Sequence, residues 1–314
     1  MDVRELQQAL EEFIFVGQAH ELGIFQELHR KIDTAPGLSK RMRFDQRCTW
    51  VLLEALVEMH YLVKRDDTYV VPDDVYQRLV ERGGAYYEGD FWQFLYYLLD
   101  PWRTLSHVLQ HGTPDESSYE KFSIEDFIRA MDSPWKKRLT PEIVDICLRS
   151  IDRVERVMDV GGAPGTIARE FANRGIQVVI YDLPESVSVT AEELSSVANI
   201  DVLSGDATEE LPAGGYDIVF LGNLCHGQSP EDNVKILQQS HNRLREGGIV
   251  VIFENIRGES YLGARLALHM ITQSPRGNVY TREEYRGWLD EAGFSGMVIT
   301  PLSDKSWQLI IASR

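Results

Sequence analysis

The segment Arg156–Thr166, with sequence RVMDVGGAPGT, combines a short apolar strand, a glycine-rich turn and the start of a helix. A glycine turn between a strand and a helix lets a small ligand approach the backbone at the carboxyl edge of a parallel sheet. A second apolar strand, Val178–Tyr181, is followed by Asp182. An acid at this distance from the turn can accept hydrogen bonds from both ribose hydroxyls of a nucleoside. The two features together predict a nucleoside cofactor.

The glycine spacing narrows the identity of that cofactor. A dinucleotide fingerprint, G-x-G-x-x-G, would need glycines where Ala163 and Thr166 stand, or one where Pro164 stands. A phosphate-binding Walker loop is excluded because no Gly-Lys-Ser/Thr follows. A nucleoside without a pyrophosphate fits better, and S-adenosyl-L-methionine is the common one. Taken alone, the turn is better explained as an ordinary strand–helix connection, so the rest of the chain has to decide.

Composition limits the partners and the compartment. The 314 residues suffice for one large domain or two moderate ones, and 32 basic against 49 acidic residues give a net charge of −17. This charge opposes binding to nucleic acid and to anionic membranes. The three cysteines are far apart, which fits a reducing compartment and argues against disulfides or a cysteine zinc site. The N-terminus lacks a signal-peptide core and no apolar run could span a bilayer, so we expect a cytoplasmic protein.

The first half of the chain is predicted to be mostly helical. Helical spacing of apolar residues, a helix over 48–60 and a strand–turn–strand over 61–71 indicate a winged-helix module in residues 1–85. Its mixed charges argue against DNA binding and favour dimerisation. Residues 86–150 are rich in aromatic residues, and we expect a helical linker that also contributes to a substrate pocket.

The second half, residues 151–314, alternates strands and helices, which is typical of a parallel sheet. Strands are predicted near 156–160, 178–182, 200–204, 216–222 and 248–254. A helix over 230–245 is indicated by Ser229 as N-cap, Pro230 in the first turn and a Gly-Gly stop. Two final strands, Gly296–Thr300 and Trp307–Ala312, should pair antiparallel.

In this order, the motifs resemble those of S-adenosylmethionine-dependent O-methyltransferases with an N-terminal winged-helix dimerisation domain. This family includes caffeate-type and acetylserotonin-type enzymes and a bacterial natural-product branch. The matching motifs are Asp159-Val-Gly-Gly-x-x-Gly165, Asp182-Leu-Pro184, Gly205-Asp206, Leu224-Cys-His226, Gly247-Gly248, Glu254 and Tyr280-Thr-x-x-Glu-Tyr285. The resemblance implies an α/β fold: a class I methyltransferase Rossmann-like sheet with an antiparallel C-terminal hairpin, plus a mostly helical N-terminal domain that forms a homodimer.

The resemblance also implies a site for S-adenosyl-L-methionine, which would leave as S-adenosyl-L-homocysteine. The residues that match the family's cofactor site are Asp159, Gly161, Gly162, Gly165, Asp182, Leu183, Asp206, Ala207 and Asn223. Asp159 would fix the turn or meet the amino group, Asp182 would hold the ribose, and Leu183 would pack on the adenine. Asp206 would accept from the adenine amino group; the alternative is a turn residue after a strand.

The reaction would need a nucleophile in line with the sulfonium methyl and a group that takes its proton. His226 is the candidate base, with Glu254 at the end of the next strand to orient its ring. The alternative is a capping or core histidine beside the Ser229 helix. The family's His-Asp is His226-Gly227 here, and a second family glutamate is replaced by Val279.

The sequence therefore predicts an O-methyltransferase that acts on a hydroxyl of a small secondary metabolite. The predicted pocket residues are Phe122, Met131, Trp135, His269 and Met270. His226 and His269 would be two ligands of a metal site without a placed third, so we expect no metal. C- or N-methylation, non-methyl chemistry on the same scaffold and a non-enzymatic winged-helix regulator are the alternatives.

Overall fold

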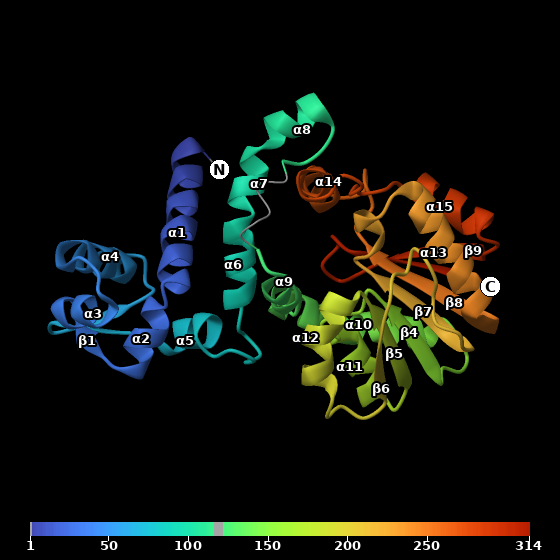
Figure 1. The fold of residues 1–314 in the computed structure, drawn as a ribbon, viewed down its shortest axis with the longest axis horizontal. Helices are drawn as coiled ribbons and strands as arrows, with labels where there is room; N and C mark the ends of the chain where they lie inside the picture. Colours follow the sequence, from blue (N-terminus) through green and yellow to red (C-terminus); the bar gives the residue numbers. More distant parts are fainter. Residues whose placement is uncertain (1, 116–121) are drawn as a thin grey trace. The chain divides into compact units, whose positions relative to one another are not determined.

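The computed structural model describes residues 2–115 and 122–314 (Figure 1). Its contacts divide the chain into two compact units, Met1–Leu98 and Leu99–Arg314. The boundaries predicted from the sequence, after residues 85 and 150, differ from this division. The difference has a packing reason: helix α6 (Gly89–Tyr97) packs on α1 (Val3–Glu21), where the Trp92 and Phe13 rings stack with centroids 5.6 Å apart.

The N-terminal unit is a group of helices with a small antiparallel sheet. Its helices are α1, α2 (Ile24–Arg30), α3 (Ala35–Met42), α4 (Gln46–Glu58), α5 (Asp73–Leu79) and α6. Its strands, β1 (Asp33–Thr34), β2 (Val63–Arg65) and β3 (Thr68–Val70), lie in the order β1-β3-β2. The helix and the strand–turn–strand expected from the sequence are both found. Asp2 and Glu5 begin α1 with a reciprocal capping box.

The C-terminal unit contains a seven-stranded sheet in the order β6-β5-β4-β7-β8-β10-β9. The strands are β4 (Arg156–Val160), β5 (Gln177–Asp182), β6 (Ile200–Ser204), β7 (Tyr216–Gly222), β8 (Leu244–Glu254), β9 (Ser295–Pro301) and β10 (Gln308–Ser313). Strands β4 to β8 run parallel, and β10 is antiparallel to both β8 and β9. The prediction of a parallel sheet completed by a terminal hairpin is therefore confirmed.

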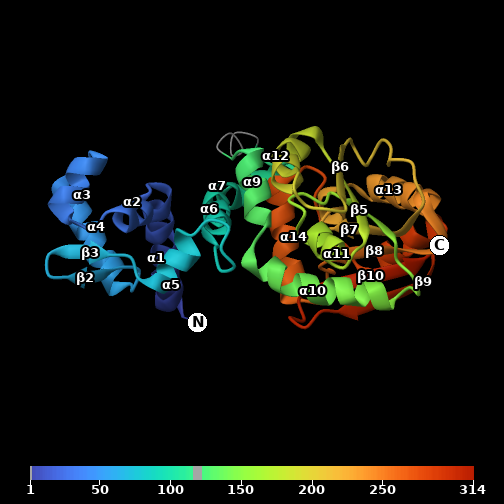
Figure 2. The same cartoon turned by 90° about the horizontal axis from the view of Figure 1, so that it is seen from below.

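Helices cover both faces of this sheet (Figure 2). On β7, Val219 and Leu221 pack with α13 (Pro230–Arg243) and α15 (Arg282–Glu291). The alternate residues Ile218 and Phe220 pack on the other face. The helices there are α10 (Pro134–Arg149), α11 (Thr166–Asn173) and α12 (Pro184–Leu194). Burial on both faces explains why the central strands β4, β5 and β7 are mostly apolar.

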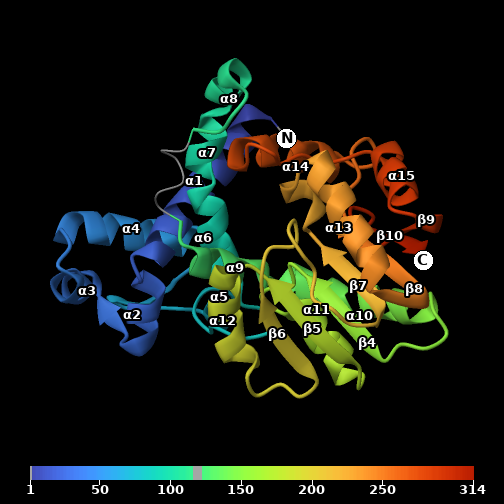
Figure 3. The ribbon, with the colours of Figure 1, turned by 45° about the vertical axis from the view of Figure 1, so that its right-hand side comes forward.

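The strand order reverses between β4 and β7 (Figure 3). Strands β5 and β6 lie on one side of β4, whereas β7 and β8 lie on the other, so the connections that follow β4 and β7 diverge. In open α/β sheets a ligand crevice forms outside the carboxyl ends at this point. The described part of the unit also contains α7 (Leu99–Arg103), α8 (Leu105–His111), α9 (Ile124–Met131) and α14 (Tyr261–Gln273), with α7 and α8 in contact with α14.

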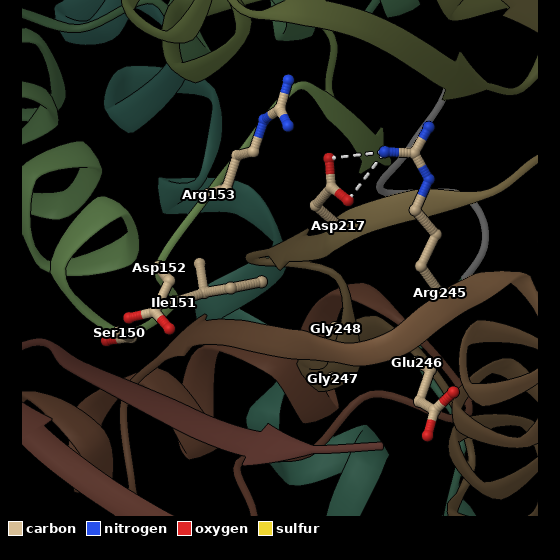
Figure 4. A pocket seen from close by; sticks show the side chains of 9 residues that line it. All are labelled: Ser150, Ile151, Asp152, Arg153, Asp217, Arg245, Glu246, Gly247 and Gly248. Atoms are coloured by element: carbon tan, nitrogen blue, oxygen red, sulfur yellow. Dashed lines mark hydrogen bonds and ion pairs between the residues drawn. The ribbon is translucent and has the colours of Figure 1, made fainter.

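A surface hollow lies at the opposite, amino-terminal edge of the sheet (Figure 4). Asp217 accepts hydrogen bonds from the backbone N–H groups of Glu155 and Arg156 and pairs with Arg245 at 2.9 Å. These bonds tie the segment before β4 to the starts of β7 and β8. The residues that line the hollow include none of the predicted site residues.

Within the described parts of the chain, no helix is long and apolar enough to cross a membrane.

Candidate active site

The turn after β4 has a backbone conformation that requires glycine. Gly161 and Gly165 have φ of 68° and 88°, in the left-handed region. A Cβ on Gly165 would lie 2.7 Å from Leu194 Cδ1, and one on Gly161 would lie 3.1 Å from Leu224 Cδ1. The Gly161 N–H donates to the Tyr181 carbonyl at 2.8 Å. The turn is thus held close to both β5 and the segment after β7.

Asp159, the fourth residue of β4, is a buried carboxylate with an unused oxygen. Its side chain is 2% exposed, and a Cβ on Gly162 would lie 2.6 Å from its Cγ. Oδ2 has no hydrogen-bond partner among the described residues. Burial raises the pKa of Asp159 to about 7, Asp182 adds to this rise, and Lys136 opposes it. An orphaned carboxylate oxygen beside bare backbone suits a cationic ligand group such as the amino group of the predicted cofactor.

The carboxylate of Asp182, at the end of β5, also supports the turn. Oδ2 accepts from the Ala163 N–H at 3.0 Å and Oδ1 accepts from the Leu183 N–H at 2.8 Å. Each oxygen keeps a second lone pair, so the group can still accept from ribose hydroxyls. The Leu183 side chain is 47% exposed and can cover a flat apolar ring. These features fit the predicted nucleoside end of the cofactor.

Asp206 lies just beyond β6. It is exposed, and its Oδ1 accepts from both the backbone N–H and the hydroxyl of Thr208 at 2.8 Å. This is the geometry of the turn residue that the sequence left as an alternative. The adjacent Ala207 is partly buried against the core. A carboxylate that uses one oxygen for the turn has the other oxygen left for a ligand.

The segment after β7 brings the candidate base to the same edge. Asn223 adopts φ of 57°, which asparagine tolerates, and its N–H donates to the Phe253 carbonyl at 2.9 Å. A short 3₁₀ helix, Cys225–Gly227, follows and carries His226. The His226 carbonyl accepts from the Asn278 N–H at 2.9 Å. Backbone bonds on both sides therefore fix the position of the imidazole.

His226 and Glu254 form a hydrogen-bonded pair. Glu254 ends β8 and is fully buried, and its Oε2 lies 2.8 Å from His226 Nδ1. Its Oε1 accepts from the His226 backbone N–H at 3.2 Å. Because a carboxylate only accepts, Nδ1 carries the hydrogen and Nε2 of the neutral ring holds a lone pair. The 17% exposure of the His226 side chain leaves the ring within reach of a substrate.

His269, on α14, lies near His226. Its Nδ1 accepts from the indole N–H of Trp102 at 3.0 Å. Burial lowers the pKa of His269 to about 4, and the neighbouring His226 adds to the shift. His269 is therefore neutral near pH 7. No group of three or more His, Cys, Asp or Glu residues suited to a metal ion occurs in the described parts of the chain.

The other predicted pocket residues have varied surroundings. Met270 is buried on α14, and Met131 ends α9. Phe122 meets Phe127 edge to face. Trp135 stacks on Trp307 with centroids 5.1 Å apart and is packed against the core on the α10 face of the sheet.

The sequence reading did not assign Trp102 or Lys136 to the site. Trp102 reaches His269 across 167 positions of sequence, and no local pattern marks this contact. The Lys136 side chain faces the charges of Asp159 and Asp182. A single lysine in an amphipathic helix has no distinguishing signal in the sequence.

Comparison with known proteins decides the family. The family model of the O-methyltransferase domain matches residues 110–295, more than half of the chain. The chain belongs to this family. Probable O-methyltransferase 3 of Humulus lupulus is 29% identical over 67% of this chain and 62% of its own length. This chain therefore covers less than two thirds of that relative. The 3-hydroxy-5-methyl-1-naphthoate 3-O-methyltransferase of Streptomyces sahachiroi is 25% identical over 88% of this chain and 84% of its own length.

Solved structures confirm the O-methyltransferase fold. The structure named PigF with SAH superposes with a TM-score of 0.83 at 22% identity, and the match covers 100% of both chains. PigF of Serratia is named an S-adenosyl-L-methionine-dependent methyl transferase. Family membership confirms the prediction of an S-adenosylmethionine-dependent methyltransferase and its cofactor. The orphaned Asp159 oxygen and the glycine turn fit that cofactor.

Proposed function

We propose that this O-methyltransferase methylates a phenolic hydroxyl of a small secondary metabolite, with His226 as general base. The observation that carries the proposal is the 2.8 Å hydrogen bond between His226 Nδ1 and the buried Glu254 at the reversal point of the sheet. The relative from Streptomyces sahachiroi is named for methylation of a hydroxynaphthoate oxygen, which favours an aromatic acceptor. C- or N-methylation is the competing reaction on the same scaffold.

The cofactor-binding residues would be those of the turn and the strand ends. Gly161, Gly162 and Gly165 keep the backbone bare, Asp159 offers its unused oxygen to an amino group, and Asp182 offers lone pairs to the ribose. Leu183, Asp206, Ala207 and Asn223 complete the set. When bound, the cofactor supplies a sulfonium methyl group that is electrophilic without further activation.

His226 would accept the proton of the acceptor hydroxyl at Nε2 as the oxygen becomes nucleophilic. Glu254 would hold the ring in the required tautomer and stabilise the imidazolium that forms. General base catalysis of this kind is typically worth about 10²–10⁴-fold in rate. The neighbouring His269 would line the acceptor pocket as a neutral imidazole, together with Met270, Met131, Phe122 and Trp135.

The N-terminal unit would act as a winged-helix dimerisation domain. Support comes from helices α2 to α4 followed by the β2–β3 hairpin, and from the exposed apolar side chains of Val3, Leu6 and Leu10 on α1. The chain would then be a cytoplasmic homodimer with residues 1–85 as dimerisation domain, 86–150 as helical linker and 151–314 as catalytic domain. The net charge of −17 favours a small-molecule acceptor over nucleic acid or membrane.

The test is methyl transfer from labelled S-adenosylmethionine to a panel of phenols that includes a hydroxynaphthoate. We expect a labelled methyl ether and S-adenosylhomocysteine as products. His226→Ala should lower turnover about 10²–10⁴-fold with cofactor affinity unchanged, whereas His29→Ala, an exposed histidine of α2, should have no effect. A product methylated at carbon or nitrogen, or full turnover by His226→Ala, would contradict the proposal.

A further inference from the structure

The turn that carries His226 is held by hydrogen bonds from a distant part of the chain. Residues 225–228, here called the base turn, follow β7. The His226 carbonyl accepts from the backbone N–H of Asn278 at 2.9 Å. The Gln228 carbonyl accepts from the side-chain hydroxyl of Tyr280 at 2.5 Å. Two donors that are close together in the sequence therefore fix two carbonyl groups of the base turn.

The same two residues also bind the chain just after Glu254. Glu254 is the last residue of β8, and Arg257 follows it by three positions. The Arg257 N–H donates to the Tyr280 carbonyl at 2.9 Å. The Arg257 guanidinium donates to the side-chain oxygen of Asn278 at 3.2 Å. Residues 278–280, here called the bridging segment, thus connect the end of β8 to the base turn.

The Tyr280 side chain is held in place by aromatic neighbours on α15. Its ring meets the rings of Trp288 and Tyr285 edge to face, with centroids 4.6 Å and 6.3 Å away. The residue is 2% exposed. Burial raises the pKa of Tyr280 to about 12, so the hydroxyl keeps its proton at neutral pH and acts as a donor. The bond to the base turn therefore starts from a side chain that is packed into the core.

The residues beside these bonds supply no further polar side chain to hold the pair. Gly227, in the base turn, has no side chain, and Val279, in the bridging segment, is apolar and fully buried. The direct bonds within the pair are the two that Glu254 accepts from His226. The bridging segment is therefore the part of the chain that binds both partners' segments at once.

We propose that the bridging segment, through the Tyr280 hydroxyl, keeps His226 at hydrogen-bond distance from Glu254, and that Tyr280 is a positioning residue for the reaction. The inference rests on the proposed role of His226 as base and adds to it the group that holds the base in place. Without the hydroxyl, the Gln228 carbonyl loses this donor and the base turn can shift relative to β8. Such a shift lowers the rate because proton transfer depends on the position of the base.

The first test measures methyl transfer by Tyr280→Phe, with the phenol of the panel that the wild type methylates fastest. We expect kcat to fall about 10- to 100-fold, the upper value being the typical cost of a displacement of about 1 Å. The KM for S-adenosylmethionine should change less than about twofold, because an interaction that acts only on the chemical step lowers kcat without changing KM.

The second test observes the His226 Nδ1–H proton by NMR in full-length protein labelled with 15N-histidine. The resonance is assigned by its absence from His226→Ala. In the wild type this proton is held by Glu254, whereas in Tyr280→Phe its resonance should broaden or be lost to exchange with water. Tyr61→Phe is the matched control, since Tyr61 is also buried and its hydroxyl donates to Glu12 at 3.0 Å in the N-terminal unit. This control should lose stability but keep kcat and the resonance.

Wild-type kcat in a folded Tyr280→Phe would overturn the inference. An unchanged Nδ1–H resonance would overturn it as well, since a tyrosine that merely stabilises the fold would leave this proton in place. If Tyr280→Phe does not fold, as judged by circular dichroism, Asn278→Ala removes the side-chain bond to Arg257 through a smaller change. Its kcat and resonance must then change in the same direction. Full turnover by His226→Ala would instead refute the proposed base, and the inference with it.

Discussion

Replacement of Asp159 by asparagine should make the ligand-free protein more stable at neutral and alkaline pH. The carboxyl is buried, and desolvation raises its pKa from 3.8 to about 7 in the folded state. Between these two values the folded protein holds a proton that the unfolded chain releases. The stability that this proton provides is complete below pH 3.8 and is lost as the pH rises to 7.

The magnitude follows from the size of the shift. At about 1.36 kcal/mol per pKa unit, burial of the Asp159 carboxyl costs the folded state about 4 kcal/mol at pH 8, where the group is ionised. At pH 5 the folded group is protonated, and taking up that proton costs about 1–2 kcal/mol. Asparagine has nearly the same shape and no charge, so the stability of the Asp159→Asn protein lacks this pH dependence. The gain in unfolding free energy from Asp159→Asn should therefore be about 3 kcal/mol larger at pH 8 than at pH 5.

Urea unfolding of the cofactor-free proteins at the two pH values measures this difference. Asp201→Asn, an exposed aspartate of β6, is the matched control and should follow the wild-type pH dependence. Cofactor affinity should change in the opposite direction, because asparagine cannot pair with the cofactor's ammonium group. Parallel pH profiles for Asp159→Asn and the wild type would refute the reasoning, since they would mean that Asp159 ionises normally in the folded protein.

Three further predictions concern the turn and the base. Glu254→Gln should lower kcat about 10- to 100-fold with unchanged affinity for S-adenosylhomocysteine, because an amide cannot stabilise the imidazolium as a carboxylate does. A kcat of the variant equal to that of the wild type would show that the carboxylate is dispensable. Gly165→Ala should cost more than about 1–2 kcal/mol of stability and abolish cofactor binding, since its Cβ would meet Leu194. The control is Gly175→Ala, at φ of 81° with no atom within 4 Å of the added Cβ, which should cost only the backbone strain. Equal losses of stability in thermal unfolding of the two variants would contradict the steric argument. Gly227→Asp restores the family's His-Asp pair and should leave the fold intact, because no atom lies within 4 Å of a Cβ at this position. A loss of more than about 1 kcal/mol in unfolding free energy would show that the space is not available.

The strands and the pairing of His226 with Glu254 were within reach of the sequence because both depend on local patterns. Apolar runs that end in polar residues mark strand ends, and parallel strand ends meet at one edge of a sheet. Spacing along the chain was therefore enough to place a histidine after β7 beside a glutamate at the end of β8. The 2.8 Å contact between the side chains follows from that register.

The domain boundary and the charge pattern were not predictable in the same way. The aromatic residues of 86–97 could equally have packed on either unit, and tertiary contacts such as those of Trp92 with Phe13 and Tyr61 assign them to the first. The contact of Trp102 with His269 likewise depends on tertiary packing. Lys136 has no motif, and its placement among the charges of Asp159, Asp132 and Asp182 depends on the fold. Unpaired charges are a property of the folded site.

The two ends of the site differ in how far the protein has completed them on its own. At the proposed acceptor end, Glu254 already accepts hydrogen bonds from both the ring and the backbone N–H of His226, so the imidazole is held in place before any ligand binds. At the cofactor end, Asp159 Oδ2 and the Ser133 hydroxyl are buried without a hydrogen-bond partner among the described residues, at a cost in stability that a ligand can remove. Binding of S-adenosylmethionine should therefore stabilise the fold by more than its contact area alone would give, whereas an acceptor should add little.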